Sequence, residues 1–159
     1  MKFLNVQLYG LSGIAHPALQ HIQTTRDCKK LRSHLKFLTC DLIPHTPTSP
    51  ACLLCNDCST DTNTTEHILV SCKAMRDVRD RIFPELINTV FQVQPMSGIL
   101  TYNIPAPIMT QFILDCASFN LPDNIRIPTH NPRISEIYRV ARDWCFAINN
   151  ERCRLLRQH

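Results

Sequence analysis

The chain has 159 residues, of which 44% are hydrophobic and 19% charged, and these ordinary values for a globular protein exclude global disorder. It is long enough for one domain or two small units with a modest core, and no apolar run approaches the roughly 18 residues of a membrane-spanning helix. Glycine occurs three times and proline eleven times, which favours helices joined by proline-marked connections over a sheet with glycine turns.

Cysteine usage and charge indicate a compartment and a class of partner. Nine cysteines is an odd number without the even framework of a secreted disulfide protein, and the first residues are only weakly similar to a signal peptide. We therefore expect an intracellular protein of the nucleus or cytoplasm. The net charge of +4 is concentrated in residues 1–45 and 132–159, around a slightly acidic middle. This distribution suits weak binding of a polyanion.

The first predicted helix begins after Thr24 or Thr25, either of which is a suitable cap. Apolar residues then recur every three or four positions, which is helical spacing: Cys28, Leu31, Leu35 and Leu38. The remaining faces are basic and carry Lys29, Lys30, Arg32 and Lys36. Phosphate contacts and an ordinary solvated surface explain these charges equally well.

A proline-marked spacer leads into four metal-ligand residues with the spacing C-x2-C-x11-H-x4-C: Cys52, Cys55, His67 and Cys72. Two cysteines two residues apart can bind one ion from a tight turn, and a helical turn brings the histidine and the last cysteine to the same ion. Three thiolates and one imidazole form a usual structural zinc set, which is closed and leaves no position for water. We predict a CCHC zinc knuckle, with the cysteine pair on a short hairpin, that stabilises the fold.

A second cysteine pair overlaps the first, because Cys55 and Cys58 are also two residues apart. Cys58 is therefore an alternative to Cys52 as a ligand, although we favour Cys52. The other cysteines are expected to be core or incidental thiols: Cys28, Cys40, Cys116, Cys145 and Cys153.

An amphipathic helix is predicted after the loop, with Thr64 as its cap. Its inner side carries Ile68, Leu69, Cys72, Met75, Val78 or Arg79, and Ile82. Pro84 breaks or kinks it, and residues 86–91 form a further turn or two. Because zinc with three thiolates has a net charge of −1, phosphate binding must come from flanking basic residues, namely Lys73, Arg76 and Arg79.

Two helices are predicted in the C-terminal part. Residues 108–119 are short and strongly apolar, which indicates a buried helix. Pro132 suits the first position of a long last helix with Asn131 as its cap. The apolar stripe of this helix is Ile134, Ile137, Tyr138, Ala141, Trp144, Cys145, Ile148 and Leu155. Self-association through residues 132–156 is an alternative function that this stripe suggests.

These elements predict a mostly α fold with a small zinc knuckle. The predicted organisation is a basic helical N-terminal segment at residues 1–45, the zinc knuckle and its following helix at 46–93, and a helical C-terminal region at 94–159.

One family shares the central motifs. They are RSHLKFLT at residues 32–39, CLLC at 52–55, TEHILVSC at 65–72 and the pair Arg76-x2-Arg79. This pattern resembles the C-terminal zinc-binding region of non-LTR (LINE-like) retrotransposon reverse transcriptases. The resemblance implies that Cys52, Cys55, His67 and Cys72 are the metal ligands. It also implies that Arg32 and Arg79 are basic contacts to RNA or DNA.

The chain also departs from that family. Cys40 stands where relatives often have glycine, and no Asp-Asp dipeptide is present to hold the two metal ions of a polymerase site. We therefore expect no enzymatic activity. The resemblance implies a zinc-stabilised nucleic-acid-binding tail of a reverse transcriptase polyprotein, without the polymerase. A zinc-stapled protein-interaction module and a decayed copy without a present role are the alternatives.

Overall fold

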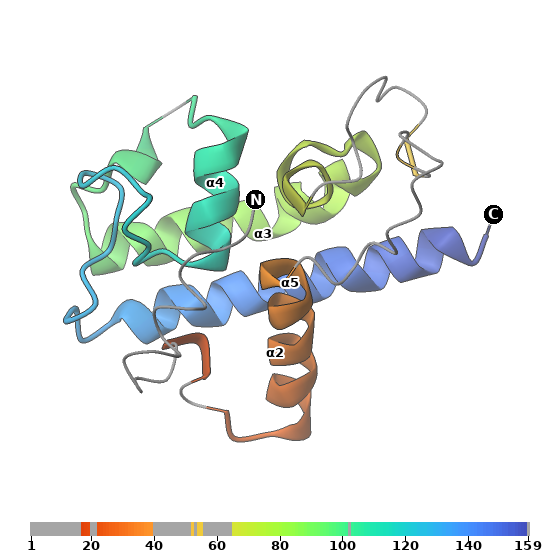
Figure 1. Ribbon diagram of the computed structural model, residues 1–159, viewed down its shortest axis with the longest axis horizontal. Helices are drawn as coiled ribbons and strands as arrows, with labels where there is room; N and C mark the ends of the chain where they lie inside the picture. Colours follow the sequence, from red (N-terminus) through yellow and green to blue (C-terminus); the bar gives the residue numbers. More distant parts are fainter. Residues whose placement is uncertain are drawn as a thin grey trace.

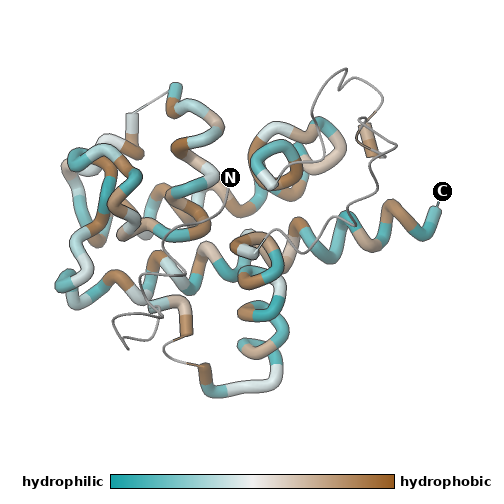
Figure 2. The backbone as a smooth tube through the Cα atoms, in the orientation of Figure 1, coloured by the Kyte–Doolittle hydropathy of each residue, from teal (hydrophilic) through white to brown (hydrophobic). Residues whose placement is uncertain are grey.

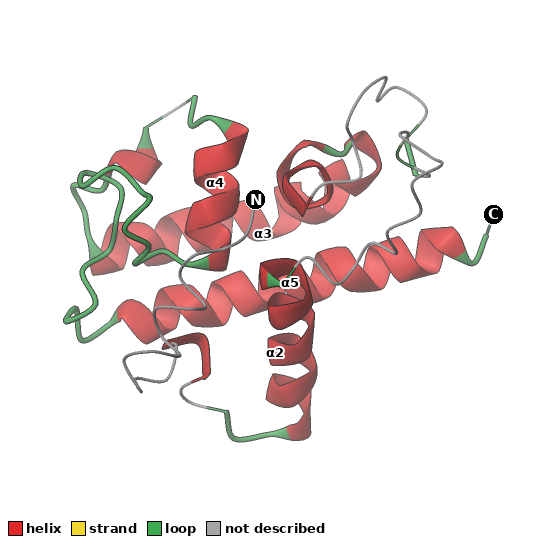
Figure 3. Ribbon diagram, viewed as in Figure 1, coloured by secondary structure: helices red, strands yellow, loops and turns green. Residues whose placement is uncertain are grey.

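A computed structural model describes residues 17–19, 22–39, 52, 54–55, 65–101 and 103–158. Across these ranges the chain forms helices and no strand (Figure 3), which confirms the mostly α fold class. The short turns are η1 (Pro17–Leu19), the π-helical η2 (His67–Ser71), η3 (Lys73–Met75) and η4 (Gly98–Leu100). The longer helices are α2 (Thr25–Leu38), α3 (Arg76–Val93), α4 (Ala106–Leu114) and α5 (Ile134–Leu156).

Helix α5 is the central element of the fold. It packs most extensively against α3, which runs alongside it, and against α2, which crosses it steeply (Figure 1). Hydrophobic residues recur along α5 at helical spacing (Figure 2). Its buried residues are Ile134, Ile137, Tyr138, Val140, Ala141, Arg142, Trp144, Cys145 and Ile148. Within the described ranges, each helix is too short or too polar to span a bilayer.

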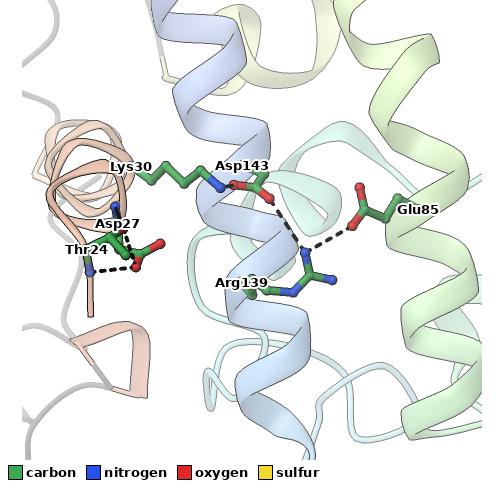
Figure 4. Close-up of polar contacts among 6 residues, drawn as sticks. All are labelled: Thr24, Asp27, Lys30, Glu85, Arg139 and Asp143. Carbon is green, nitrogen blue, oxygen red and sulfur yellow. Dashed lines mark hydrogen bonds and ion pairs between the residues drawn. The ribbon is translucent and has the colours of Figure 1, made fainter. Parts of the chain in front are cut away.

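The start of α2 follows the sequence prediction, with Thr24 as the cap. The backbone N–H of Asp27 donates to Thr24 Oγ1 at 3.1 Å, and Asp27 Oδ2 accepts from the backbone N–H of Thr24 at 3.0 Å (Figure 4). This reciprocal capping box satisfies two N–H groups that the first helical turn leaves without partners. The helix therefore begins where its local sequence dictates.

The predicted buried face of α2 is wrong in its first half. Cys28 is exposed, and the buried residues are Ser33, His34, Phe37 and Leu38. Because α2 crosses α5 steeply, only its C-terminal half reaches the core. The buried His34 lies with Nε2 at 2.8 Å from the carbonyl oxygen of Leu114, which ties α2 to the end of α4.

A chain of ion pairs connects α2, α5 and α3 (Figure 4). Lys30 of α2 pairs with Asp143 of α5. Arg139 lies 3.7 Å from the second oxygen of Asp143 and 3.2 Å from a carboxylate oxygen of Glu85 on α3. The half-exposed pair of Arg139 and Glu85 contributes little to stability, so we attribute to this chain of ion pairs the alignment of the three helices and not their association.

The segment predicted as one helix from residue 65 is interrupted at Cys72. Its backbone is extended there, with φ −60° and ψ 121°, which no helix accommodates. The chain therefore forms η2, then η3, and only then α3. Pro84, predicted to break or kink the helix, does not end it, and α3 continues to Val93. Buried residues on both sides of the proline, Val78 and Leu86, keep the two halves in the core.

The ends of the last two helices differ from the prediction. Helix α4 stops at Leu114 and not at Phe119, which is 72% exposed. Asp115 ends it and is buried, where it accepts from Tyr138 Oη at 2.6 Å and from the backbone N–H of Ala117 at 3.1 Å. Helix α5 begins two residues later than predicted, because Asn131 caps a preceding turn by accepting from the N–H of Arg133 at 2.9 Å.

Some predictions fall outside the described residues. They are the cap at Thr64, the loop residues of the cysteine hairpin, Cys40 and Cys58. The residues that are described near the first cysteine pair, Cys52, Leu54 and Cys55, are not in a strand.

Candidate metal centre

The structure brings together the four residues that the spacing predicts. Cys52, Cys55, His67 and Cys72 are buried, and each offers one ligand atom within 4.8 Å of the other three. Cys52 Sγ lies 3.9 Å from Cys72 Sγ, and Cys55 Sγ lies 3.4 Å from His67 Nε2. The four atoms therefore enclose one point at which a metal ion can bind.

The turn η2 places the histidine and the last cysteine on the same side. The backbone N–H of Cys72 donates to the carbonyl oxygen of His67 at 2.6 Å, which closes the turn. Ile68 and Leu69 between them are buried. Trp144 Nε1 of α5 donates to the carbonyl oxygen of Leu69 at 3.2 Å. The ligand-bearing turn is thus fixed to α5 by a hydrogen bond and by its apolar side chains.

A contact to α2 anchors the other end of this segment. Thr65 Oγ1 donates to the carbonyl oxygen of Phe37, near the end of α2, at 3.5 Å. The segment that carries His67 and Cys72 is therefore attached to two helices, to α2 through Thr65 and to α5 through the Leu69 carbonyl.

The sulfur–sulfur separation excludes a disulfide between Cys52 and Cys72. A disulfide bond is about 2.0 Å long, and the observed 3.9 Å is almost twice that. Neither cysteine forms a disulfide. Three buried thiolates at these distances repel one another, and a bound cation offsets that repulsion. The donor set and the geometry of the cluster suit a metal ion.

Burial sets the protonation of the ligands in the absence of metal. It raises the pKa of the Cys72 thiol from 9.0 to about 12, and the neighbouring charge of Cys52 adds to this effect. Burial also lowers the pKa of His67, with a second contribution from the positive charge of Arg79. At neutral pH the imidazole is therefore ready to bind a metal, whereas Cys72 must lose a proton to do so.

We expect the metal-free chain to lose stability in alkali and the metal-loaded chain to resist this loss. The folded chain holds the Cys72 proton more tightly than the unfolded chain, because its pKa rises from 9.0 to about 12. This stabilisation is complete below the unfolded pKa and is lost as the pH rises through the folded pKa. A bound metal removes that proton and with it the alkaline loss. Urea denaturation across this range, with and without chelator, measures the difference.

The metal-free Cys72→Ser variant is the control for this prediction, because it removes the raised pKa. It should show a shallower alkaline loss than the metal-free wild type. Equal losses in the two metal-free proteins would contradict an origin in Cys72.

The basic residues predicted to contact nucleic acid lie in different environments. Lys29, Arg32, Lys73 and Arg76 are exposed, and Lys36 is half-buried. Lys30 is paired with Asp143, and its side chain is only 19% exposed. Its charge is therefore neutralised within the fold.

Arg79 is the other basic residue that differs from its predicted setting. It is half-buried on the first turns of α3, close enough to the metal-site residues for its charge to act on His67. The sequence indicated its charge and its helix but not this proximity. Nothing in the sequence indicated that the Leu69 carbonyl accepts from Trp144.

The comparisons with known proteins identify no relative. The chain matches no family model, no curated protein and no solved structure. The resemblance of residues 31–85 to the retrotransposon region therefore depends on the sequence motifs.

Proposed function

We propose that the metal is zinc and that its role is structural. In a tetrahedral site with Zn–S bonds of about 2.3 Å and Zn–N bonds of about 2.0 Å, two sulfurs lie about 3.8 Å apart, and a sulfur and a nitrogen about 3.5 Å apart. The separations of 3.9 Å and 3.4 Å are close to these values. The four protein ligands fill the tetrahedron, so the ion has no position for a reacting water.

We further propose that the chain binds RNA or DNA, as the zinc-binding tail of a non-LTR retrotransposon-type reverse transcriptase polyprotein without its polymerase. The observation that carries this proposal is the position of Lys73 and Arg76 beside the metal ligands. Lys73 follows Cys72 directly, Arg76 begins α3, and both are exposed. A metal bound at Cys72 would fix the backbone from which these two side chains extend.

The second part of the proposed surface is α2, where Lys29 and Arg32 are exposed. The contact of Thr65 with Phe37 joins this helix to the ligand-bearing segment. The metal site itself carries a net charge of −1, so these lysine and arginine side chains supply the attraction for phosphate. Such binding weakens with salt and shows little sequence preference.

A salt titration tests the nucleic-acid proposal. We expect zinc-loaded wild type to bind a single-stranded RNA or a DNA duplex of equal length with a dissociation constant that rises steeply with salt. The double variant Lys73→Gln/Arg76→Gln should reduce the slope of log K against log salt by about two, one for each lost phosphate contact. Fluorescence anisotropy over a salt series measures both slopes.

The control for this titration is Arg126→Gln/Arg133→Gln, which removes the same charge. These arginines are paired with Asp123 at 2.8 Å and Glu136 at 2.7 Å. The control should keep the wild-type slope. An absence of binding at low salt, or an affinity that is indifferent to salt, would contradict the proposal.

Self-association gains no support from a particular contact. The apolar stripe of α5 that suggested it is largely buried against α2 and α3 of the same chain. A partner would therefore need a different surface, and we do not propose this role.

A further inference from the structure

Arg79 carries a buried guanidinium nitrogen that the fold leaves without a partner. Its Nη1 atom is inaccessible to solvent and makes no hydrogen bond within the described part of the chain. Burying a charged donor without an acceptor is costly. A phosphate-contacting arginine would instead extend into solvent, as the exposed Arg76 one turn earlier is placed to do. The position of Arg79 therefore calls for a compensating negative charge inside the protein.

Two of the metal-site residues interact electrostatically with this guanidinium. Burial lowers the pKa of Arg79, and the charge of Cys72 opposes this effect more strongly than the charge of Asp80 does. Arg79 in turn acts on His67, at the other end of η2. The guanidinium is thus within electrostatic reach of ligands at both ends of this turn.

The charge of the loaded site matches that of Arg79. A divalent ion with three thiolates and a neutral imidazole carries −1, which is costly to bury unless a cation lies close by. We propose that Arg79 is the counter-charge of the metal centre and a positioning residue for its ligands, and that it does not contact nucleic acid. This inference deepens the proposed function and rests on its metal site.

The role predicts a loss of metal affinity when the charge is removed. Arg79→Gln should bind Zn²⁺ about 10- to 100-fold more weakly than wild type, which is the usual cost of losing a residue that supports metal ligands. Arg79→Lys keeps the charge and should recover most of the affinity. Arg81→Gln, on the same helix and exposed, removes an equal charge and should leave the affinity unchanged. Competition with a chromophoric chelator measures the Zn²⁺ affinity of all four proteins.

The absorption spectrum of the Co²⁺-loaded protein distinguishes the loss of this charge from a general loss of packing. A positive charge near the thiolates lowers the energy of their electrons, so its removal shifts the sulfur-to-Co²⁺ charge-transfer band to longer wavelength. We expect this shift in Arg79→Gln and not in Arg81→Gln. The salt slope of RNA binding by zinc-loaded Arg79→Gln should equal that of wild type, because Arg79 makes no phosphate contact.

The outcomes separate this inference from the function on which it rests. If reduced wild type binds no metal, both fail. If wild type binds one ion and Arg79→Gln binds it as tightly as Arg81→Gln does, the metal centre stands and the role of Arg79 is overturned. Weakening of Arg79→Lys equal to that of Arg79→Gln would also overturn it, as would a salt slope reduced by about one in Arg79→Gln.

Discussion

Replacing Cys72 by serine is expected to abolish tight metal binding. A serine hydroxyl does not ionise near neutral pH, so the variant loses a thiolate ligand and leaves the ion with three protein donors. Structural zinc sites supply about 10–16 kcal/mol of apparent binding free energy at neutral pH, and that energy is coupled to folding. With free zinc at about 1,000 times the wild-type dissociation constant, the loss of binding removes about 4 kcal/mol of stability.

Native mass spectrometry of the reduced proteins measures this result directly. Wild type should carry one zinc ion, and Cys72→Ser none, or zinc bound far more weakly. Cys28→Ser is the matched control, because Cys28 is exposed on α2 and lies outside the cluster. Wild type without metal would contradict the proposed centre, and a Cys72→Ser variant with one tightly held ion would remove Cys72 from the ligand set.

The clustering of the four candidate ligands was predictable because it depends on residue types and spacing. Cys52 and Cys55 are two residues apart, and His67 and Cys72 are five apart, so short local segments suffice to bring each pair together. The interruption of the helix at Cys72 was not predictable in this way. It coincides with the hydrogen bond from Trp144 to the Leu69 carbonyl, a partner 75 residues away.

The helices show the same division between local and long-range causes. The cap at Thr24 was predictable because Thr24 and Asp27 bond to each other. The apolar stripe of α5 was predictable because that helix is buried along most of one face. The buried face of α2 was not, since it depends on the angle at which α2 crosses α5.

The charges in the sequence were the least reliable guide to which basic residues belong to the candidate nucleic-acid-binding surface. The sequence places Lys30 and Arg79 among the residues expected to contact nucleic acid, but it does not reveal what packs against them. Asp143 of α5 neutralises Lys30, and the metal-site residues lie near Arg79. Both settings arise from contacts between helices.

Replacing Trp144 by alanine has the second largest expected effect. The side chain is 2% exposed, and its ring meets that of Phe83 edge-on at a centroid distance of 6.4 Å. Removing a buried aromatic side chain of this size costs about 3–5 kcal/mol of unfolding free energy. Trp144→Phe keeps most of the packing but loses the hydrogen bond to the buried Leu69 carbonyl, at a cost of about 1–3 kcal/mol.

Urea denaturation followed by far-ultraviolet circular dichroism measures these losses, since Trp144 is the only tryptophan and its fluorescence disappears with it. Phe91→Ala is the control, because Phe91 lies on α3 and is 59% exposed. It should change the unfolding free energy by no more than about 0.5 kcal/mol. A loss in Trp144→Ala as small as that of Phe91→Ala would contradict the central place of this residue in the core.

Trp144 should also affect the stability that the bound metal contributes. Leu69 lies between His67 and Cys72, so an indole that holds its carbonyl also holds the turn that presents both ligands. The free energy lost in Trp144→Ala should therefore be larger for the zinc-loaded protein than for the metal-free protein. The difference between the two losses is the coupling energy between the core and the metal centre. Equal losses in the two states would mean that Trp144 packs the helices without positioning the ligands.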